Sequence, residues 1–241
     1  MIFKVKGTKN SMNNLPKHIA IIPDGNRRWA KEKGLPTFEG HRQGFNQSIK
    51  IAKKVRNLGI KVLSFWAFST ENWKRDKEEI SYLMDLYYQM MKINIKEALR
   101  EKVRIIHLGR KDRISNKLRL KISEAEEKTK NFDNYYLAIA LDYGGRDEII
   151  RVINKINQLK IKAKNFSEEK INQLLDTKDL PYPYPDLIIR TSGEVRTSGF
   201  MIWQAAYSEW IFHPKHFPDF TPYDLEKCVE EYKKRKRRFG V

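Results

Sequence analysis

The chain has 241 residues, 40% of them hydrophobic, and a formal net charge of +18. This length and apolar content suffice for a sizeable core in one large domain or two small ones, which excludes a disordered or fibrous protein. The single Cys228 excludes an internal disulfide and a multi-cysteine zinc site. A reduced cytoplasm is therefore the expected location.

The apolar runs are far shorter than the roughly 20 residues that a membrane-spanning helix requires. The first fourteen residues are polar and basic and lack the apolar core of a secretory signal. We expect residues 1–14 to form a flexible tail and residues 15–241 to form a single domain, because no repeat, linker or shift of composition interrupts the chain.

Strand-like and helical segments alternate along the chain. Apolar, strand-like runs occupy 18–22, 61–68, 103–108, 135–141 and 186–190, and helical patterns lie near 41–57, 77–100, 113–130, 146–159, 167–176 and 222–236. Nearly unbroken apolar strands joined by helices predict a mostly parallel sheet covered by helices on both faces. Ligands of such sheets bind outside the carboxyl ends of the strands.

Four polar residues follow these strands directly, namely Asp24, Ser69, Asp142 and Arg190. The parallel arrangement predicts that they share one rim of the sheet. The alternative is that they are ordinary polar loop residues, but this does not explain why Arg, Asp, Glu and Ser gather there together.

The first motif, IIPDGNRRWA, combines Asp24, Gly25 and two arginines at a strand end. Gly25 permits close backbone approach, and arginines clamp phosphate oxygens as a bidentate fork. Asp24 beside a bound anion requires a bridging cation such as Mg²⁺, unless it merely caps the following helix. Neither GxGxxG nor a GK[ST] loop occurs, which disfavours dinucleotide and ordinary nucleoside-triphosphate sites.

Two further motifs have similar chemistry. SFWAFSTENWKRDKEE places aromatic residues beside hydrogen-bonding groups, which suits an amphiphilic substrate or, equally, a strand end with Glu71 or Asn72 as a helix cap. DLIIRTSGEVRTSGFMIW supplies Arg190, Arg196 and several hydroxyls for a second diphosphate. Glu209 beyond it is either a metal ligand or an ordinary surface carboxylate.

The chain resembles the cis-prenyltransferase family, the undecaprenyl (polyprenyl) diphosphate synthases. The resemblance runs through HIAIIPDGNRRWA, GHRQG, AFSTENWKR, DYGGR, DLIIRTSGEVRTSGFMIWQAAYSEW and RRFG, in the family's order. It implies a six-stranded parallel sheet with flanking helices, a homodimer and a requirement for Mg²⁺. It also implies repeated addition of isopentenyl diphosphate to an allylic diphosphate primer, each step creating a cis double bond.

The resemblance implies a role for each matching residue. Asp24 and Glu209 would hold the metal, and Asn72 would be a proton acceptor, although an amide is a very weak base. The implied substrate-binding residues are Gly25, Asn26, Arg27, Arg28, Trp29, His41, Ser69, Thr70, Glu71, Trp73, Arg75, Arg190, Arg196, Thr197 and Ser198.

An apolar stripe recurs at helical spacing within 80–91, and the resemblance favours a product tunnel there, while plain core packing fits equally well. It consists of Ile80, Leu83, Met84, Tyr87, Met90 and Met91. Thr37 stands where bacterial members commonly have an arginine, and Val195 where a histidine is frequent. The spelling DLIIRTSGEVRTSGF is closer to archaeal or eukaryotic members, some of which use a geranylgeranyl rather than a farnesyl primer.

The ending Arg238-Phe239-Gly240 resembles the family's Arg-x-Gly, which reaches across a dimer interface. Together with Asp24 it predicts a homodimer rather than the non-catalytic subunit of a mixed pair. The net charge fits a coat of solvated lysines, phosphorylated substrates, a loosely bound membrane surface, or nucleic acid. Nucleic acid is disfavoured because its usual motifs are missing.

Overall fold

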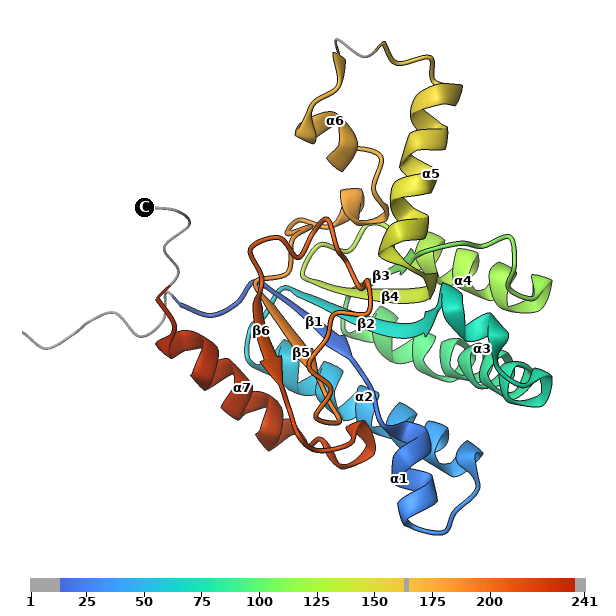
Figure 1. The fold of residues 1–241 in the computed structure, drawn as a ribbon, viewed down its shortest axis with the longest axis vertical. Helices are drawn as coiled ribbons and strands as arrows, with labels where there is room; N and C mark the ends of the chain where they lie inside the picture. The colour runs from blue at the N-terminus through green and yellow to red at the C-terminus, as the bar shows by residue number, and fades with distance from the viewer. Residues whose placement is uncertain (1–13, 163–164, 237–241) are drawn as a thin grey trace, which may run out of the picture.

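The computed structural model describes residues 14–162 and 165–236. Its six strands form one sheet in the order β3-β4-β2-β1-β5-β6, and all neighbouring strands run parallel (Figure 1). The strands are β1 (His18–Ile22), β2 (Val62–Ser69), β3 (Val103–Leu108), β4 (Tyr135–Tyr143), β5 (Leu187–Arg190) and β6 (Glu209–Phe212). The predicted fold, a single α/β domain with a six-stranded sheet, is confirmed.

Seven α-helices connect or follow the strands within the described ranges. They are α1 (Asn26–Glu32), α2 (Thr37–Asn57), α3 (Lys77–Arg100), α4 (Asn116–Thr129), α5 (Gly145–Gln158), α6 (Glu168–Asn172) and α7 (Pro222–Lys234). The 3-10 helices include Thr70–Lys74, Asp176–Asp179 and Phe217–Asp219. The bounds of α3 match the prediction, whereas α2 begins four residues earlier than predicted and the expected helix at 167–176 is only α6.

The sheet is buried on both faces, which explains its unbroken apolar strands. Ile19 and Ile21 of β1 face a core completed by α2 and α7. The alternate residues Ala20 and Ile22 face a second core, which contains Phe200 from the segment between β5 and β6. A third core joins α3 and α4 to β2, β3 and β4.

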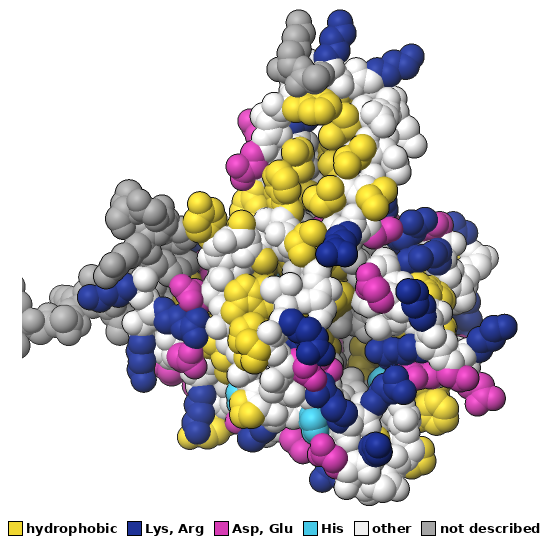
Figure 2. All heavy atoms as spheres, in the orientation of Figure 1, with side chains coloured by type: hydrophobic (Ala, Val, Ile, Leu, Met, Phe, Trp, Pro, Cys, Tyr) yellow, Lys and Arg dark blue, Asp and Glu magenta, His cyan; other side chains and the backbone are white. Residues whose placement is uncertain are grey.

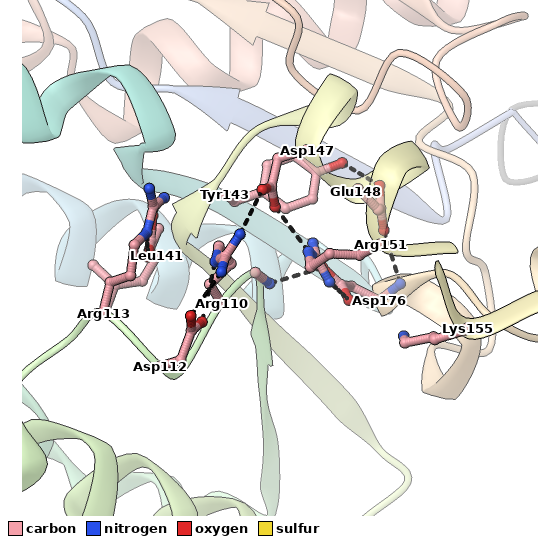
Figure 3. A network of polar contacts seen from close by, with 12 residues as sticks. Arg110, Asp112, Arg113, Leu141, Tyr143, Asp147, Glu148, Arg151, Lys155 and Asp176 are labelled. Carbon is pink, nitrogen blue, oxygen red and sulfur yellow. Dashed lines mark hydrogen bonds and ion pairs between the residues drawn. The ribbon is translucent and has the colours of Figure 1, made fainter. Parts of the chain in front are cut away.

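Helix α5 projects from the body of the molecule (Figure 1) and is anchored at its base by a polar network (Figure 3). The buried Glu148 accepts hydrogen bonds from Tyr143 Oη over 2.6 Å and from the backbone N–H of Asp176 over 2.8 Å. Burial, reinforced by the charge of Asp176, raises the pKa of Glu148. Arg151 pairs with Asp176, so this network joins α5 to the segment that returns to β5.

The ends of the chain are mostly outside the description. Of the predicted tail only Asn14 is described, and its Nδ2 donates to the Lys233 carbonyl over 2.9 Å. The predicted Arg238-Phe239-Gly240 ending also lies outside the described residues. Within 14–162 and 165–236, no helix combines the length and apolar character needed to span a bilayer.

Candidate active site

Asp24 and Arg190 meet where the sheet reverses its strand order. β1 and β5 are neighbours, with Ile22 in register with Arg190, and the chain continues from them toward opposite edges of the sheet. Ligands of open α/β sheets bind at such a switch point, outside the carboxyl ends of the strands. Arg190 Nη2 donates to Asp24 Oδ2 over 2.8 Å. The predicted convergence of these two residues at one rim is confirmed.

A cluster of opposite charges surrounds Asp24. Arg28 Nη2 donates to Asp24 Oδ1 over 3.1 Å and Arg28 Nη1 to Glu194 Oε1 over 2.5 Å, while Arg196 also pairs with Glu194. Burial alone would raise the pKa of Asp24, but the hydrogen bond and charge of Arg190, followed by those of Arg28, lower it below its ordinary value. Three guanidinium groups thus face two carboxylates, so the cluster carries a net positive charge.

Arg190 is nearly buried and retains unused donor capacity. Its Nη1 donates to Ser198 Oγ over 2.8 Å and to the Arg196 carbonyl over 2.5 Å. Its Nε is buried and has no hydrogen-bond partner in the structure of the described residues. A planar guanidinium held this way is oriented for an oxyanion that arrives at the rim.

Helices α1 and α2 pack unusually close together because of the two glycines in GHRQG. A Cβ on Gly40 would lie 2.0 Å from the Asn26 carbonyl oxygen, and one on Gly44 would lie 2.4 Å from Asn26 Oδ1. Glycine has a low helix propensity, and Gly40 immediately precedes the predicted start of this helix at residue 41. The close approach fixes the helix that contains Arg27 and Arg28.

A buried carboxylate, Glu79, connects three predicted site residues, and sequence reasoning missed it. Glu79 Oε1 lies 3.0 Å from His41 Nε2 and accepts from Arg75 Nη1 over 3.0 Å, while Arg27 Nε is 3.9 Å from Glu79 Oε2. Burial lowers the pKa of His41, against the opposing effect of Glu79. A glutamate in the first turn of a long helix is typical of a solvated cap, and only the fold identifies its role.

The 3-10 helix Thr70–Lys74 orients the second motif. Asn72 Oδ1 accepts from the backbone N–H of Ser69 over 3.1 Å. The N-cap is Ser69, and Asn72 is the third helical residue of a capping box, so Asn72 takes part in the cap without being the cap residue itself. Trp73 Nε1 donates to Asp142 Oδ1 over 2.8 Å, and Arg113 Nε donates to Asp142 Oδ2 over 2.9 Å. Asp142 is fully buried with a φ of +54°. This rim residue therefore holds Trp73 instead of facing the cavity.

A cavity of about 1050 Å³ opens at this rim and extends beneath α2 and α3. Lys61 and Val103, at the amino ends of β2 and β3, also line it, so it runs the length of the sheet. The eight residues of β2 correspond to about 26 Å. Of the stripe on α3, the lining residues are Leu83, Tyr87, Met90 and Met91, whereas Ile80 and Met84 belong to the packed core alone. The stripe therefore both lines the cavity and packs in the core.

Most of the predicted site residues lie on the cavity wall. These are Asp24, Gly25, Asn26, Arg27, Arg28, His41, Ser69, Asn72, Arg75, Arg190 and Ser198. The remaining predicted residues are outside its lining: Trp29, Thr70, Glu71, Trp73, Arg196, Thr197 and Glu209. Thr37, the first departure from the family pattern, also lines the cavity, whereas Val195 is exposed.

Glu209 does not lie near Asp24 within this chain. It is the first residue of β6 and is in register with Leu187, at the amino end of β5, whereas Asp24 follows the carboxyl end of β1. Three residues of strand rise, about 10 Å, separate the level of Glu209 from the end of β1. Asp24 lies beyond that end, in a turn whose N–H donates to the Ile22 carbonyl. Glu209 instead pairs with Arg235 over 2.8 Å. The sequence pattern did not indicate β6, so the edge on which Glu209 falls could not be foreseen.

The donor set at the rim fits a magnesium ion that is shared with a substrate. In the described part of the chain, no group of three His, Cys, Asp or Glu residues could hold a metal ion alone. Asp24 lines the cavity as an ionised carboxylate, since its pKa is lowered. Mg²⁺ is commonly held by one or two carboxylates together with substrate phosphates and water.

The sheet has guanidinium groups at its switch point and a long apolar cavity beneath them. This combination defines a protein that binds amphiphilic anions. A family model described as "Putative undecaprenyl diphosphate synthase" matches residues 22–240. An isoprenyl transferase of Thermotoga maritima is 48% identical over 228 residues, which cover 94% of this chain and 97% of that protein. The chain belongs to the undecaprenyl diphosphate synthase family and is a prenyl transferase.

Other relatives carry more specific names. The ditrans,polycis-undecaprenyl-diphosphate synthase of Micrococcus luteus, named as (2E,6E)-farnesyl-diphosphate specific, is 42% identical over 246 residues, covering 99% of this chain and 98% of that protein. Among solved structures, lavandulyl diphosphate synthase from Lavandula x intermedia, in complex with dimethylallyl diphosphate, is 35% identical with a TM-score of 0.91. That match covers 94% of this chain and 99% of the lavender chain.

Proposed function

We propose that this protein catalyses the Mg²⁺-dependent, sequential condensation of isopentenyl diphosphate with an allylic diphosphate primer. The product is a long-chain polycis-polyprenyl diphosphate, a precursor of a glycosyl carrier lipid. One observation carries the proposal: the arginine-rich rim opens directly into the apolar cavity. Its volume of about 1050 Å³ is at the upper limit of ordinary small-molecule sites, as a growing lipid chain requires.

The residues of the rim would divide the two substrates between them. Asn26, Arg27, Arg28 and His41 would hold the primer diphosphate, with its hydrocarbon chain in the cavity. Arg190 and its neighbours Arg196 and Ser198 would hold isopentenyl diphosphate. When bound, Mg²⁺ would neutralise the departing diphosphate, with Asp24 as its protein ligand. Glu209 could complete a metal site only from a second copy of the chain or after rearrangement, since it lies at the amino end of its strand whereas Asp24 follows the carboxyl end of β1.

Bond changes follow from this arrangement. The allylic C–O bond breaks, diphosphate departs with the bonding electrons, and the allylic carbon bonds to the terminal carbon of the isopentenyl double bond. A proton is then lost to form the new double bond. Asn72 is poorly suited to accept it, because its Oδ1 is already engaged by the Ser69 N–H and an amide is a weak base. Asn72 Nδ2 can instead orient a substrate oxygen.

The chain is proposed to work as a homodimer. Ile150 and Ile153 on α5 are 58% and 51% exposed, and Tyr207 is 74% exposed. Ile202 lies against Gly145 at the base of α5. Figure 2 shows hydrophobic side chains gathered on the projecting part of the molecule. A surface of this kind is a candidate interface. Sedimentation of the protein should show a dimer, and Ile153→Glu should give monomers.

Placement at the cytoplasmic face of a membrane completes the proposal. The net charge of +18 favours loose attraction to anionic lipid. Co-sedimentation with anionic vesicles at low salt should be lost in high salt, and the protein's indifference to such vesicles at low salt would contradict this part of the proposal.

The activity is tested with the purified chain, Mg²⁺ and radiolabelled isopentenyl diphosphate. Farnesyl and geranylgeranyl diphosphate are supplied in parallel, and the extracted lipids are separated by chromatography. We expect a series of long products that disappears with EDTA and with Asp24→Ala, but persists with the matched control Asp133→Ala. Asp133 is exposed and lies between α4 and β4, away from the rim.

The primer that gives the series identifies the substrate, and the name of the Micrococcus luteus relative makes farnesyl diphosphate the first choice. Absence of product with both primers would contradict a self-sufficient synthase and favour the non-catalytic subunit of a mixed pair.

A further inference from the structure

A serine, a histidine and a glutamate from three separate segments form a continuous hydrogen-bonded chain beside the rim. Ser192 Oγ lies 2.5 Å from His216 Nδ1, and His216 Nε2 lies 2.9 Å from Glu32 Oε1. Ser192 follows β5, His216 precedes the 3-10 helix Phe217–Asp219, and Glu32 ends α1. None of the three has a role in the proposed reaction.

This group, the Ser192–His216–Glu32 relay, resembles a hydrolytic triad only in composition. An acyl-transfer site needs backbone N–H groups that are free to stabilise an oxyanion. Here the N–H of Ser192 donates to the Lys215 carbonyl and that of Gly193 to the His213 carbonyl. Ser192 is also only 7% exposed. The relay therefore lacks the free N–H groups of a hydrolytic site.

The relay lies directly against the loop that contains Asp24. A Cβ on Gly25 would be 2.5 Å from both His216 Nδ1 and Ser192 Oγ, so the Gly25 backbone rests on this pair. The next residue after His216, Phe217, donates its N–H to the Asp24 carbonyl over 3.0 Å. Any shift of the imidazole is thus transmitted to Asp24 and to the start of α1.

The relay also holds the opposite end of α1. Glu32 is the last residue of this seven-residue helix, so His216 connects to both of its ends. An isolated helix of this length is not stable by itself and depends on tertiary contacts. A carboxylate on Nε2 favours the tautomer in which Nε2 bears the proton and Nδ1 accepts from the Ser192 hydroxyl.

The backbone of Ser192 adds an independent observation. Its φ is +78°, in the left-handed region that favours glycine. Glycine would remove this strain, whereas serine retains it together with the hydroxyl that reaches His216. The retained strain indicates that the hydroxyl contributes a contact that glycine lacks.

We propose that the Ser192–His216–Glu32 relay positions α1 and Asp24 for the primer diphosphate. The inference rests on the proposed function for its kinetic consequence, but its structural consequence can be measured without turnover. His216 is a positioning residue that acts through Gly25 and α1.

The test compares Ser192→Gly, Glu32→Ala and Glu32→Gln with the matched control Glu39→Ala. Glu39 is a glutamate of the first turn of α2 that pairs with Arg42 on its own helix, and it is half-buried whereas Glu32 is exposed. Hydrogen–deuterium exchange of the 24–33 segment is measured without ligands, together with the melting temperature and the primer KM and kcat. Ser192→Gly should keep or raise the melting temperature, because it relieves backbone strain.

We expect faster exchange across 24–33 in Ser192→Gly and Glu32→Ala, with kcat/KM for the primer lowered by about tenfold to a hundredfold. Glu32→Gln retains an acceptor oxygen, so its exchange rate and its kcat/KM should stay close to those of the wild type. Glu39→Ala should change neither quantity. Unchanged exchange in both Ser192→Gly and Glu32→Ala would overturn the inference. If the wild-type chain proves inactive, the proposed function fails, and the exchange measurement still decides whether the relay holds α1.

Discussion

Replacing Gly40 by alanine tests whether close packing of α1 on α2 builds the rim. In an ordinary helix interior this change is stabilising by about 1 kcal/mol, since alanine has the higher helix propensity. Here the added Cβ would lie 2.0 Å from the backbone carbonyl oxygen of Asn26, and Cβ contacts under 3.0 Å are essentially never observed. The carbonyl must therefore move by at least 1.0 Å, the difference between these distances.

The destabilisation expected from the added Cβ outweighs the stabilisation expected from the higher helix propensity of alanine. Overpacking of this kind destabilises by about 1–3 kcal/mol, which leaves a net loss of up to about 2 kcal/mol. For a chain of this size that corresponds to a fall in melting temperature of up to about 8 °C. A displacement of 1 Å at a reacting group can lower the rate by about a hundredfold. Prenyl transfer by Gly40→Ala should therefore fall far more than its stability does.

Calorimetry and the prenyl transfer assay measure the two effects. Asn46→Ala is the matched control, because Asn46 is exposed on the same helix and its replacement should be neutral or slightly stabilising. If Gly40→Ala melts at or above the wild-type temperature and retains full activity, close packing of α1 on α2 does not position the rim, and the reasoning is refuted.

Two further predictions concern carboxylates. Asp142→Ala removes the acceptor of the Trp73 indole and should lower the free energy of unfolding by about 1–3 kcal/mol in urea titration. Asp142→Asn retains an acceptor oxygen and should lower the free energy of unfolding less. Equal effects of the two variants would contradict the role of Asp142 as a hydrogen-bond acceptor for Trp73. Burial would raise the pKa of Asp224, but hydrogen bonds from Lys215 and Thr221 outweigh it and hold the pKa at about 2. Its stabilisation is thus present above its ordinary pKa of 3.8 and is lost as the pH falls toward 2. The stability difference between wild type and Asp224→Asn should shrink over this range, and a difference that stays constant would contradict the linkage.

Much of the rim was predictable because strand identity and direction determine it. The apolar runs that became β1, β2 and β5 each end in a polar residue, and parallel strands bring those ends to one edge. Hence Asp24, Ser69 and Arg190 could be grouped from the sequence alone. Glu209 could not, because β6 is a four-residue edge strand without a clear apolar pattern.

Residues that support the rim were less predictable, because their roles depend on packing between distant segments. Glu79 has the position of a helix-capping carboxylate, yet the approach of α2 to α3 buries it against His41. Ser192 and His216 are 24 positions apart and meet only because β5 and β6 are neighbours whose following loops face Gly25. Such contacts have no local spacing that a sequence pattern could reveal.

The pairing of Asp24 with two arginines has a consequence for substrate binding under the proposed function. In the structure, the carboxylate occupies donors of Arg28 and Arg190 that a diphosphate would also seek. An incoming diphosphate must therefore compete with Asp24 or share these donors with it, and two anions at one site repel each other. A divalent cation between carboxylate and diphosphate converts that repulsion into attraction. Primer affinity should accordingly depend on Mg²⁺ in the wild type and much less in Asp24→Asn, which a binding titration with and without the metal can measure. Equal metal dependence in both proteins would show that the cation is held elsewhere.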